Sequence, residues 1–111
     1  MSPREWAPVE PVYFQSPAGN APVRDVLSKL PEVQRAQILA DITSFAELGD
    51  DAPVVWKWIK GKTNHPMREL KVGGHRVLFV VKDRRMWILE ACKKQDQERA
   101  IRVAAARMKL I

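Results

Sequence analysis

The stretch of sequence that decides the fold runs from residue 69 to residue 92 and reads ELKVGGHRVLFVVKDRRMWILEAC. Residues 69–72 alternate polar with apolar side chains, which is typical of a strand with one buried face. Residues 76–81 are apolar on both faces and therefore fit a central strand, while residues 86–92 fit a third strand. The pair Gly73-Gly74 suits a tight hairpin turn. The stretch therefore predicts a three-stranded antiparallel meander.

Helical patterns flank this meander on both sides. Upstream, residues 22–30 and 32–48 carry apolar side chains at helical spacing, and Pro31 separates them because proline cannot continue a helix. Downstream, apolar side chains recur at i, i+3, i+4 and i+7 from Ile101, which predicts a helix that begins near Gln97. A helical hairpin followed by a run of strands and a last helix indicates an α+β domain.

The other segments are expected to extend this single domain. Residues 12–15 have the composition of a short N-terminal strand, and residues 54–61 are ambiguous. Residues 1–10 contain two prolines among polar side chains and are expected to form a loose leader. A chain of 111 residues has room for one core, so we expect one domain over residues 11–111.

The composition indicates a basic protein that favours polyanions. The chain has 19 Lys and Arg against 13 Asp and Glu, a formal net charge of +6 and a pI near 9.8. RNA, DNA, an acidic membrane surface and an acidic protein are all compatible partners. The single cysteine, Cys92, excludes an internal disulfide, and no apolar run resembles a secretory signal or a membrane span. We therefore expect a cytoplasmic location.

The sequence lacks the usual signatures of cofactor, metal or nucleophile chemistry. It has no glycine-rich phosphate loop, no Gly-x-Ser-x-Gly element and no set of metal-ligand spacings, so we expect no metal and no cofactor. What remains is a set of basic side chains around the meander. They could line one cleft on the sheet, with the helices covering the other face. Such a cleft would concentrate phosphate charge and stabilise charge that develops at phosphorus.

Three short motifs follow one another in this region, at residues 69–71 (Glu-Leu-Lys), 74–79 (Gly-His-Arg-Val-Leu-Phe) and 88–94 (Ile-Leu-Glu-Ala-Cys-Lys-Lys). Their order resembles the HigB branch of the RelE/ParE toxin superfamily, which reads Glu-Leu-Arg, then Tyr-Arg-Val-Leu-Tyr, then Leu-x-Ala-Phe-x-Lys-Lys. The resemblance covers roughly residues 56–95.

This sequence departs from the family pattern at three positions. Lys71 replaces an arginine, His75 replaces an aromatic residue, and Cys92 replaces a phenylalanine. A lysine cannot make the bidentate phosphate contact of an arginine. The departures leave the order of the motifs unchanged.

The resemblance implies a RelE-like fold and a toxin of a type II toxin–antitoxin system. Such toxins cut mRNA, usually on the ribosome, and are silenced by an antitoxin, here expected to be of the helix-turn-helix type, that also binds operator DNA. The implied chemistry needs no metal, because the RNA 2′-hydroxyl attacks the adjacent phosphate and leaves a cyclic phosphate.

The resemblance also implies roles for particular residues. Arg76 would stabilise the phosphorane, and Lys94 and Lys71 would hold or activate the phosphate. Glu69 could act as a base or form a salt bridge to Lys71 or Arg68, while Cys92 is expected to be a small core residue. The basic and histidine side chains expected to contact RNA are Lys57, Lys62, His65, Arg68, His75 and Lys93.

Two other interpretations stay open at this point. A toxin of the same fold could inhibit DNA gyrase through protein contact, as the ParE branch does. A non-catalytic basic module could bind RNA or an acidic protein, which is compatible with the absence of a clear acid–base pair in the sequence.

Overall fold

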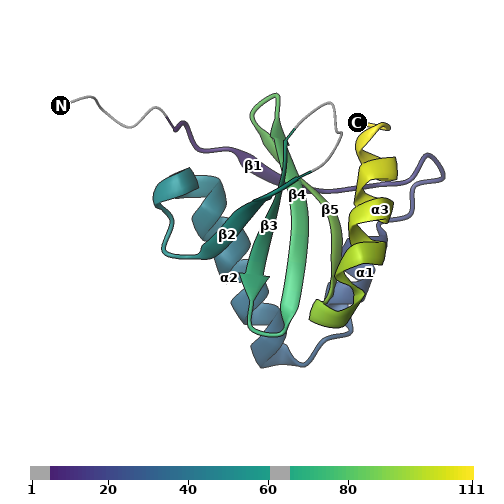
Figure 1. Cartoon of the computed structure of the whole chain (residues 1–111), viewed down its shortest axis with the longest axis horizontal. Helices are drawn as coiled ribbons and strands as arrows, with labels where there is room; N and C mark the ends of the chain where they lie inside the picture. The colour runs from purple at the N-terminus through teal and green to yellow at the C-terminus, as the bar shows by residue number, and fades with distance from the viewer. Residues whose placement is uncertain (1–5, 61–65) are drawn as a thin grey trace.

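The computed structural model describes residues 6–60 and 66–111 (Figure 1). The chain forms one sheet, with two helices before its four consecutive strands, one helix after them, and two short 3₁₀ turns. In chain order the elements are β1 (Glu10–Tyr13), α1 (Pro22–Ser28), α2 (Glu32–Leu48), the 3₁₀ turn η1 (Gly49–Asp51), β2 (Val55–Ile59), β3 (Met67–Val72), β4 (His75–Lys82), β5 (Arg85–Lys93), the 3₁₀ turn η2 (Lys94–Asp96) and α3 (Gln97–Met108).

One five-stranded sheet, in the order β1-β5-β4-β3-β2, forms the centre of the molecule. The three strands predicted from the sequence are confirmed as β3, β4 and β5, which pair antiparallel. The ambiguous segment at residues 54–61 contains a fourth strand of the meander, because β2 pairs antiparallel with β3. At the far edge, β1 joins β5 in parallel register, with Glu10 opposite Arg85 and Tyr13 opposite Ile88.

The predicted helices are confirmed with small changes at their ends. The second helix has the predicted bounds, and the first ends at Ser28 instead of residue 30. The third begins at Gln97 as predicted, and its residues Ala104 and Met108 are buried. Among the described residues, no helix has the length and apolar character needed to cross a bilayer.

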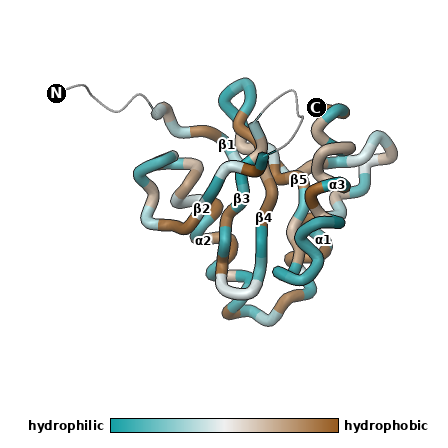
Figure 2. Tube along the Cα trace, in the orientation of Figure 1, coloured by the Kyte–Doolittle hydropathy of each residue, from teal (hydrophilic) through white to brown (hydrophobic). Residues whose placement is uncertain are grey.

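Helices cover both faces of the sheet, which corrects the expectation that all of them lie on one side (Figure 1). On one face, α1 and α2 pack against Leu70, Val77 and Phe79, a group that we call the α2-side core. On the other face, α3 packs against Met67, Leu78 and Leu89, which we call the α3-side core. The reason is the hydrophobic run along β4 (Figure 2), which needs cover on both sides.

The expected loose leader is packed where the structure describes it. Residues 1–5 lie outside the described residues, but the Trp6 ring meets Phe45 edge-on with 5.5 Å between the ring centroids. The Trp6 Nε1 donates to the Ala46 carbonyl at 3.1 Å, and the Val9 backbone N–H donates to the same oxygen at 2.9 Å. The packed part of the chain therefore includes residues before position 11.

Two glycines with nearly the same φ differ in what surrounds them. Gly49, at the end of α2, has φ +61°, and a Cβ built there would lie 2.3 Å from Trp6 Cδ2. Gly73, in the β3–β4 turn, has φ +59° and nothing within 4 Å of such a Cβ. Both positions disfavour alanine because of the left-handed backbone, but only Gly49 adds a steric clash.

We therefore expect Gly49→Ala to destabilise the protein more than its matched control Gly73→Ala. The control should lower the free energy of unfolding by about 1–2 kcal/mol through backbone strain alone. Gly49→Ala should lower it by about 1–3 kcal/mol more, because the Trp6 ring must move. Urea denaturation followed by circular dichroism measures both values. Equal losses for the two variants would show that Trp6 does not pack on Gly49 in solution.

Candidate active site

A cleft of about 270 Å³ opens on the α3 side of the sheet, between β2, β3 and the start of α3. It brings together all three residues predicted to be catalytic, Lys71, Arg76 and Lys94, and adds one predicted RNA contact, Lys57. Its lining also includes Val55, Trp56, Glu69 and Gln97. The cleft therefore holds four cationic side chains around one carboxylate.

The strand register explains why these residues meet. Lys57 lies opposite Glu69 on β2 and β3, and Lys71 lies opposite Arg76 on β3 and β4. Directly paired residues of antiparallel strands point to the same face, and residues two apart on one strand do so as well. Glu69 and Lys71 thus face away from Leu70, as the alternation predicted.

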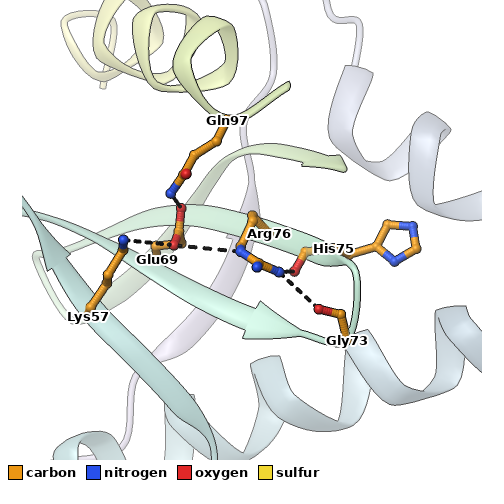
Figure 3. Close-up of polar contacts among 6 residues, drawn as sticks. All are labelled: Lys57, Glu69, Gly73, His75, Arg76 and Gln97. Carbon is orange, nitrogen blue, oxygen red and sulfur yellow. Dashed lines mark hydrogen bonds and ion pairs between the residues drawn. The ribbon is translucent and has the colours of Figure 1, made fainter. Parts of the chain in front are cut away.

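Glu69 is the buried centre of the cleft, with 2% of its surface exposed. Its Oε2 accepts a hydrogen bond from Gln97 Nε2, and its Oε1 lies 3.8 Å from Lys57 Nζ and 3.9 Å from Arg76 Nε (Figure 3). The ion pairs that we predicted for Glu69, with Lys71 or Arg68, are replaced by those with Lys57 and Arg76. A buried carboxylate is stable only when such partners surround it.

Arg76 is fixed by the turn that precedes it. Its Nη1 donates to the carbonyl oxygens of Gly73 and His75, both at 2.9 Å, and only 5% of the residue is exposed. The Lys94 backbone N–H donates to the Gly74 carbonyl at 2.9 Å, so the same turn also holds the chain at Lys94. In contrast, the Lys71 and Lys94 side chains are exposed. The cleft thus combines one fixed guanidinium with exposed ammonium groups.

Arg68, a predicted RNA contact, does not lie in the cleft. It pairs with Trp58 across β2 and β3 on the α2 side of the sheet, with its guanidinium carbon 4.0 Å from the Trp58 ring centroid. Its Nη1 donates to Asp50 Oδ1 at 2.9 Å, and only 13% of its side chain is exposed. Burial lowers the pKa of Arg68, while Asp50 acts in the opposite direction. The arginine therefore packs against the aromatic rings around Phe45 and helps to hold them in place.

Two other predicted RNA contacts, His75 and Lys93, are not brought into the cleft. His75 lies opposite Val72 and Lys93, and Val72 belongs to the α2-side core, so the His75 side chain points away from Glu69 (Figure 3). Lys93 is exposed on the same side as His75. Lys62 and His65 lie outside the described residues.

Gln97 is the cleft residue that sequence reasoning missed. It lines the cleft and holds Glu69, yet in the sequence it is only the first residue of an amphipathic helix. No spacing or residue type marks such a position as functional. Only the contact between α3 and the sheet shows its role.

Cys92 lies beside the cleft but stays protonated. It faces Arg76 across β4 and β5 and packs against the α3-side core, as expected for a small packing residue. Burial, with the nearby Glu90 and Glu69 carboxylates, raises the pKa of the Cys92 thiol to about 11. Among the described residues, no group of three or more His, Cys, Asp or Glu side chains could hold a metal ion.

Comparison with solved structures gives the class of fold. The chain is similar to the crystal structure of the archaeal RelE–RelB complex from Pyrococcus horikoshii OT3, with 18% sequence identity, a TM-score of 0.55, and coverage of 68% of this chain and 89% of that chain. This likeness confirms the predicted RelE-like α+β fold.

Comparison with family models gives the particular family. The model described as phage derived protein Gp49-like (DUF891) matches residues 25–109, and the chain belongs to this family. A search of curated proteins gave no significant match. The two findings support the RelE superfamily, while assignment to its HigB branch stays a prediction.

The raised pKa of Cys92 predicts slow alkylation of the folded protein. At pH 7.5 the thiol is almost wholly protonated, and only the thiolate reacts, so the rate with iodoacetamide should increase as the pH rises towards 11. The unfolded chain in urea, where the pKa returns to about 8.5, should react at least about tenfold faster at pH 7.5. Mass spectrometry of the single cysteine measures both rates. Equal rates would show that the Cys92 environment is not the one described.

Proposed function

We propose that this protein is the toxin of a toxin–antitoxin system and that it cleaves mRNA in the cleft as a metal-independent, ribosome-dependent endoribonuclease. The observation that carries the proposal is the convergence of Lys57, Lys71, Arg76 and Lys94 on one cleft of about 270 Å³. Membership of the Gp49-like family and the RelE-like fold support the same reading.

The cleft suits cleavage by the 2′-hydroxyl of the RNA. The hydroxyl oxygen attacks the adjacent phosphorus, its proton passes to a base, and the 5′-oxygen leaves and takes up a proton. The products are a 2′,3′-cyclic phosphate and a 5′-hydroxyl. The phosphorane formed on the way carries extra negative charge on its oxygens, which cationic donors already in position stabilise at little reorganisation cost.

Each cation has a distinct part in this mechanism. Arg76 keeps a fixed direction because two carbonyl oxygens and Glu69 hold its guanidinium. Lys71 and Lys94 are exposed and can follow the phosphate as it moves into the cleft. Glu69 keeps Lys57 and Arg76 on the same side of the sheet and is a positioning residue. Electrostatic stabilisation therefore supplies most of the rate enhancement in this proposal.

The proposed partners are those expected of a RelE-like toxin. The substrate is mRNA on the ribosome, which places the protein in the cytoplasm. A cognate antitoxin, expected to be of the helix-turn-helix type, would silence the toxin, and the RelE of the similar structure is itself in complex with RelB. Contact with DNA would be indirect, through the complex with the antitoxin.

A non-catalytic RNA-binding module is the second candidate, and a specific observation favours it. Among the described lining residues, Glu69 is engaged by three partners, and the neighbouring Cys92 thiol stays protonated. No uncommitted carboxylate, imidazole or thiolate therefore lines the described part of the cleft, which leaves only the lysines to move protons. This module would bind RNA with strong salt dependence and would cut none.

We expect Arg76→Ala to lower mRNA cleavage by about 100-fold, because it removes the fixed donor of the cleft. Lys94→Ala should lower it at least about tenfold and leaves the backbone contacts of the turn intact. Arg84→Ala, which removes an exposed arginine in the β4–β5 turn, is the matched control and should cut normally. Primer extension on cellular mRNA after brief induction measures the cuts, and circular dichroism verifies folding.

The outcomes separate the candidate functions. New cuts in translated regions with the wild type, lost in Arg76→Ala and Lys94→Ala, would support the endoribonuclease. Growth arrest with intact mRNA would overturn it and direct the search to a protein target such as gyrase. Salt-dependent RNA binding without arrest or cuts would favour the binding module.

A further inference from the structure

A second cavity of about 380 Å³ adjoins the cleft along β2 and α3. The two cavities share Lys57 and Gln97, so a strand of RNA whose phosphate lies in the cleft can reach the second cavity with a neighbouring nucleotide. The lining of the second cavity is Lys57, Trp58, Ile59, Lys60, Gln97 and Ile101. Nothing in the proposed cleavage step uses this space.

The chemistry of the second cavity fits a nucleobase. Ile59 and Ile101 are half-buried, pack against the α3-side core and give the second cavity an apolar wall. Lys57 and Lys60 are exposed at its rim, where they can meet phosphates on either side of the base. An unstacked base needs an apolar surface for its ring and a polar group for its edge. Gln97 is the polar group inside this lining.

The amide of Gln97 has one fixed orientation. Its Nε2 donates to Glu69 Oε2, and Glu69 is paired with two cations and accepts hydrogen bonds only (Figure 3). A flipped amide would place Oε1 against the carboxylate, so Glu69 prevents the flip. Gln97 therefore keeps its Oε1 as an acceptor and one N–H as a donor for a ligand. Glutamine pairs in this way with an amino group next to a ring nitrogen.

We propose that Gln97 is a specificity-determining residue and that the second cavity selects adenine or cytosine at the nucleotide next to the cleaved phosphate. Gln97 Nε2 points towards Glu69 in the cleft, so its Oε1 lies on the side away from the cleft. A nucleotide whose phosphate lies in the cleft has its sugar on the cleft side, which turns the ring nitrogen towards Nε2 and the exocyclic group towards Oε1. Adenine and cytosine then present a ring-nitrogen acceptor to Nε2 and an amino donor to Oε1, whereas uracil and guanine present an N–H donor and a carbonyl acceptor, which do not match. The RNA must be single-stranded at this position, because base pairing would occupy the same edge. The inference rests on the proposed function for the site of cleavage.

The test compares the wild type with Gln97→Met, which keeps the size of the side chain and removes both polar groups. Gln95→Met is the matched control, because Gln95 is exposed in the turn before α3 and lines neither cavity. Cut sites on translated mRNA are mapped and sorted by the base on either side of the cut. The wild type and the control should prefer adenine or cytosine at one of these positions, and Gln97→Met should lower that preference about fivefold to tenfold.

Two results would overturn the inference. A wild type that cuts without base preference at either position would leave the endoribonuclease proposal intact and exclude the base subsite. A uniform loss of cutting at all bases in Gln97→Met, with the preference unchanged, would show that Gln97 only positions Glu69.

Binding to uncleavable RNA separates this inference from the proposed function. Four short single-stranded RNAs, 2′-O-methylated throughout and each uniform in its base (A, C, G or U), are titrated by fluorescence polarisation. Tighter binding of the A and C strands, lost in Gln97→Met but kept in Gln95→Met, supports the subsite even if the wild type cuts no RNA. Equal binding of all four strands by the wild type contradicts it.

Discussion

The buried carboxylate of Glu69 is the interaction on which the site depends. It joins three elements, because Lys57 comes from β2, Arg76 from β4 and Gln97 from α3. Loss of one partner of a buried charge typically costs about 3–5 kcal/mol, so the three contacts support one another. The same carboxylate gives Arg76 its direction and fixes the amide of Gln97. The structural ion network and the proposed phosphate-binding arrangement are thus made by the same atoms.

The Gly73-Gly74 turn is the second constraint on the cleft. Its carbonyl oxygens hold Arg76 through Nη1 and the Lys94 backbone through its N–H, although these two residues belong to different segments. A left-handed φ of +59° at Gly73 permits this tight reversal. Two cationic residues therefore converge on one cleft without a dedicated glycine-rich loop. In the proposed mechanism, their fixed main chain lowers the reorganisation needed when charge develops on the phosphorane.

The hydrophobic run of β4 explains where the cleft can and cannot be. Both faces of β4 need cover, and α3 provides it on the side where we had expected an open basic face. The open space is therefore confined to the region between β2, β3 and the start of α3. This confinement makes Gln97 part of the site. On the other face, Arg68 fills the space among the aromatic rings and is withdrawn from solvent.

The sequence by itself determined the class of fold, the three central strands and the helices. It also singled out Lys71, Arg76 and Lys94, which the structure brings into one cleft. It could do so because the side-chain period of a strand is local, and alternation places Glu69 and Lys71 on one face whatever the partner strand. Only the tertiary structure decided which side chains and helices pack against each face of the sheet. The strand register and the docking of α3 paired Glu69 with Lys57 and Gln97, and they assigned Arg68, His75 and Lys93 to the other face. Contacts between distant segments depend on packing of both faces at once, and no local pattern of residues contains that information.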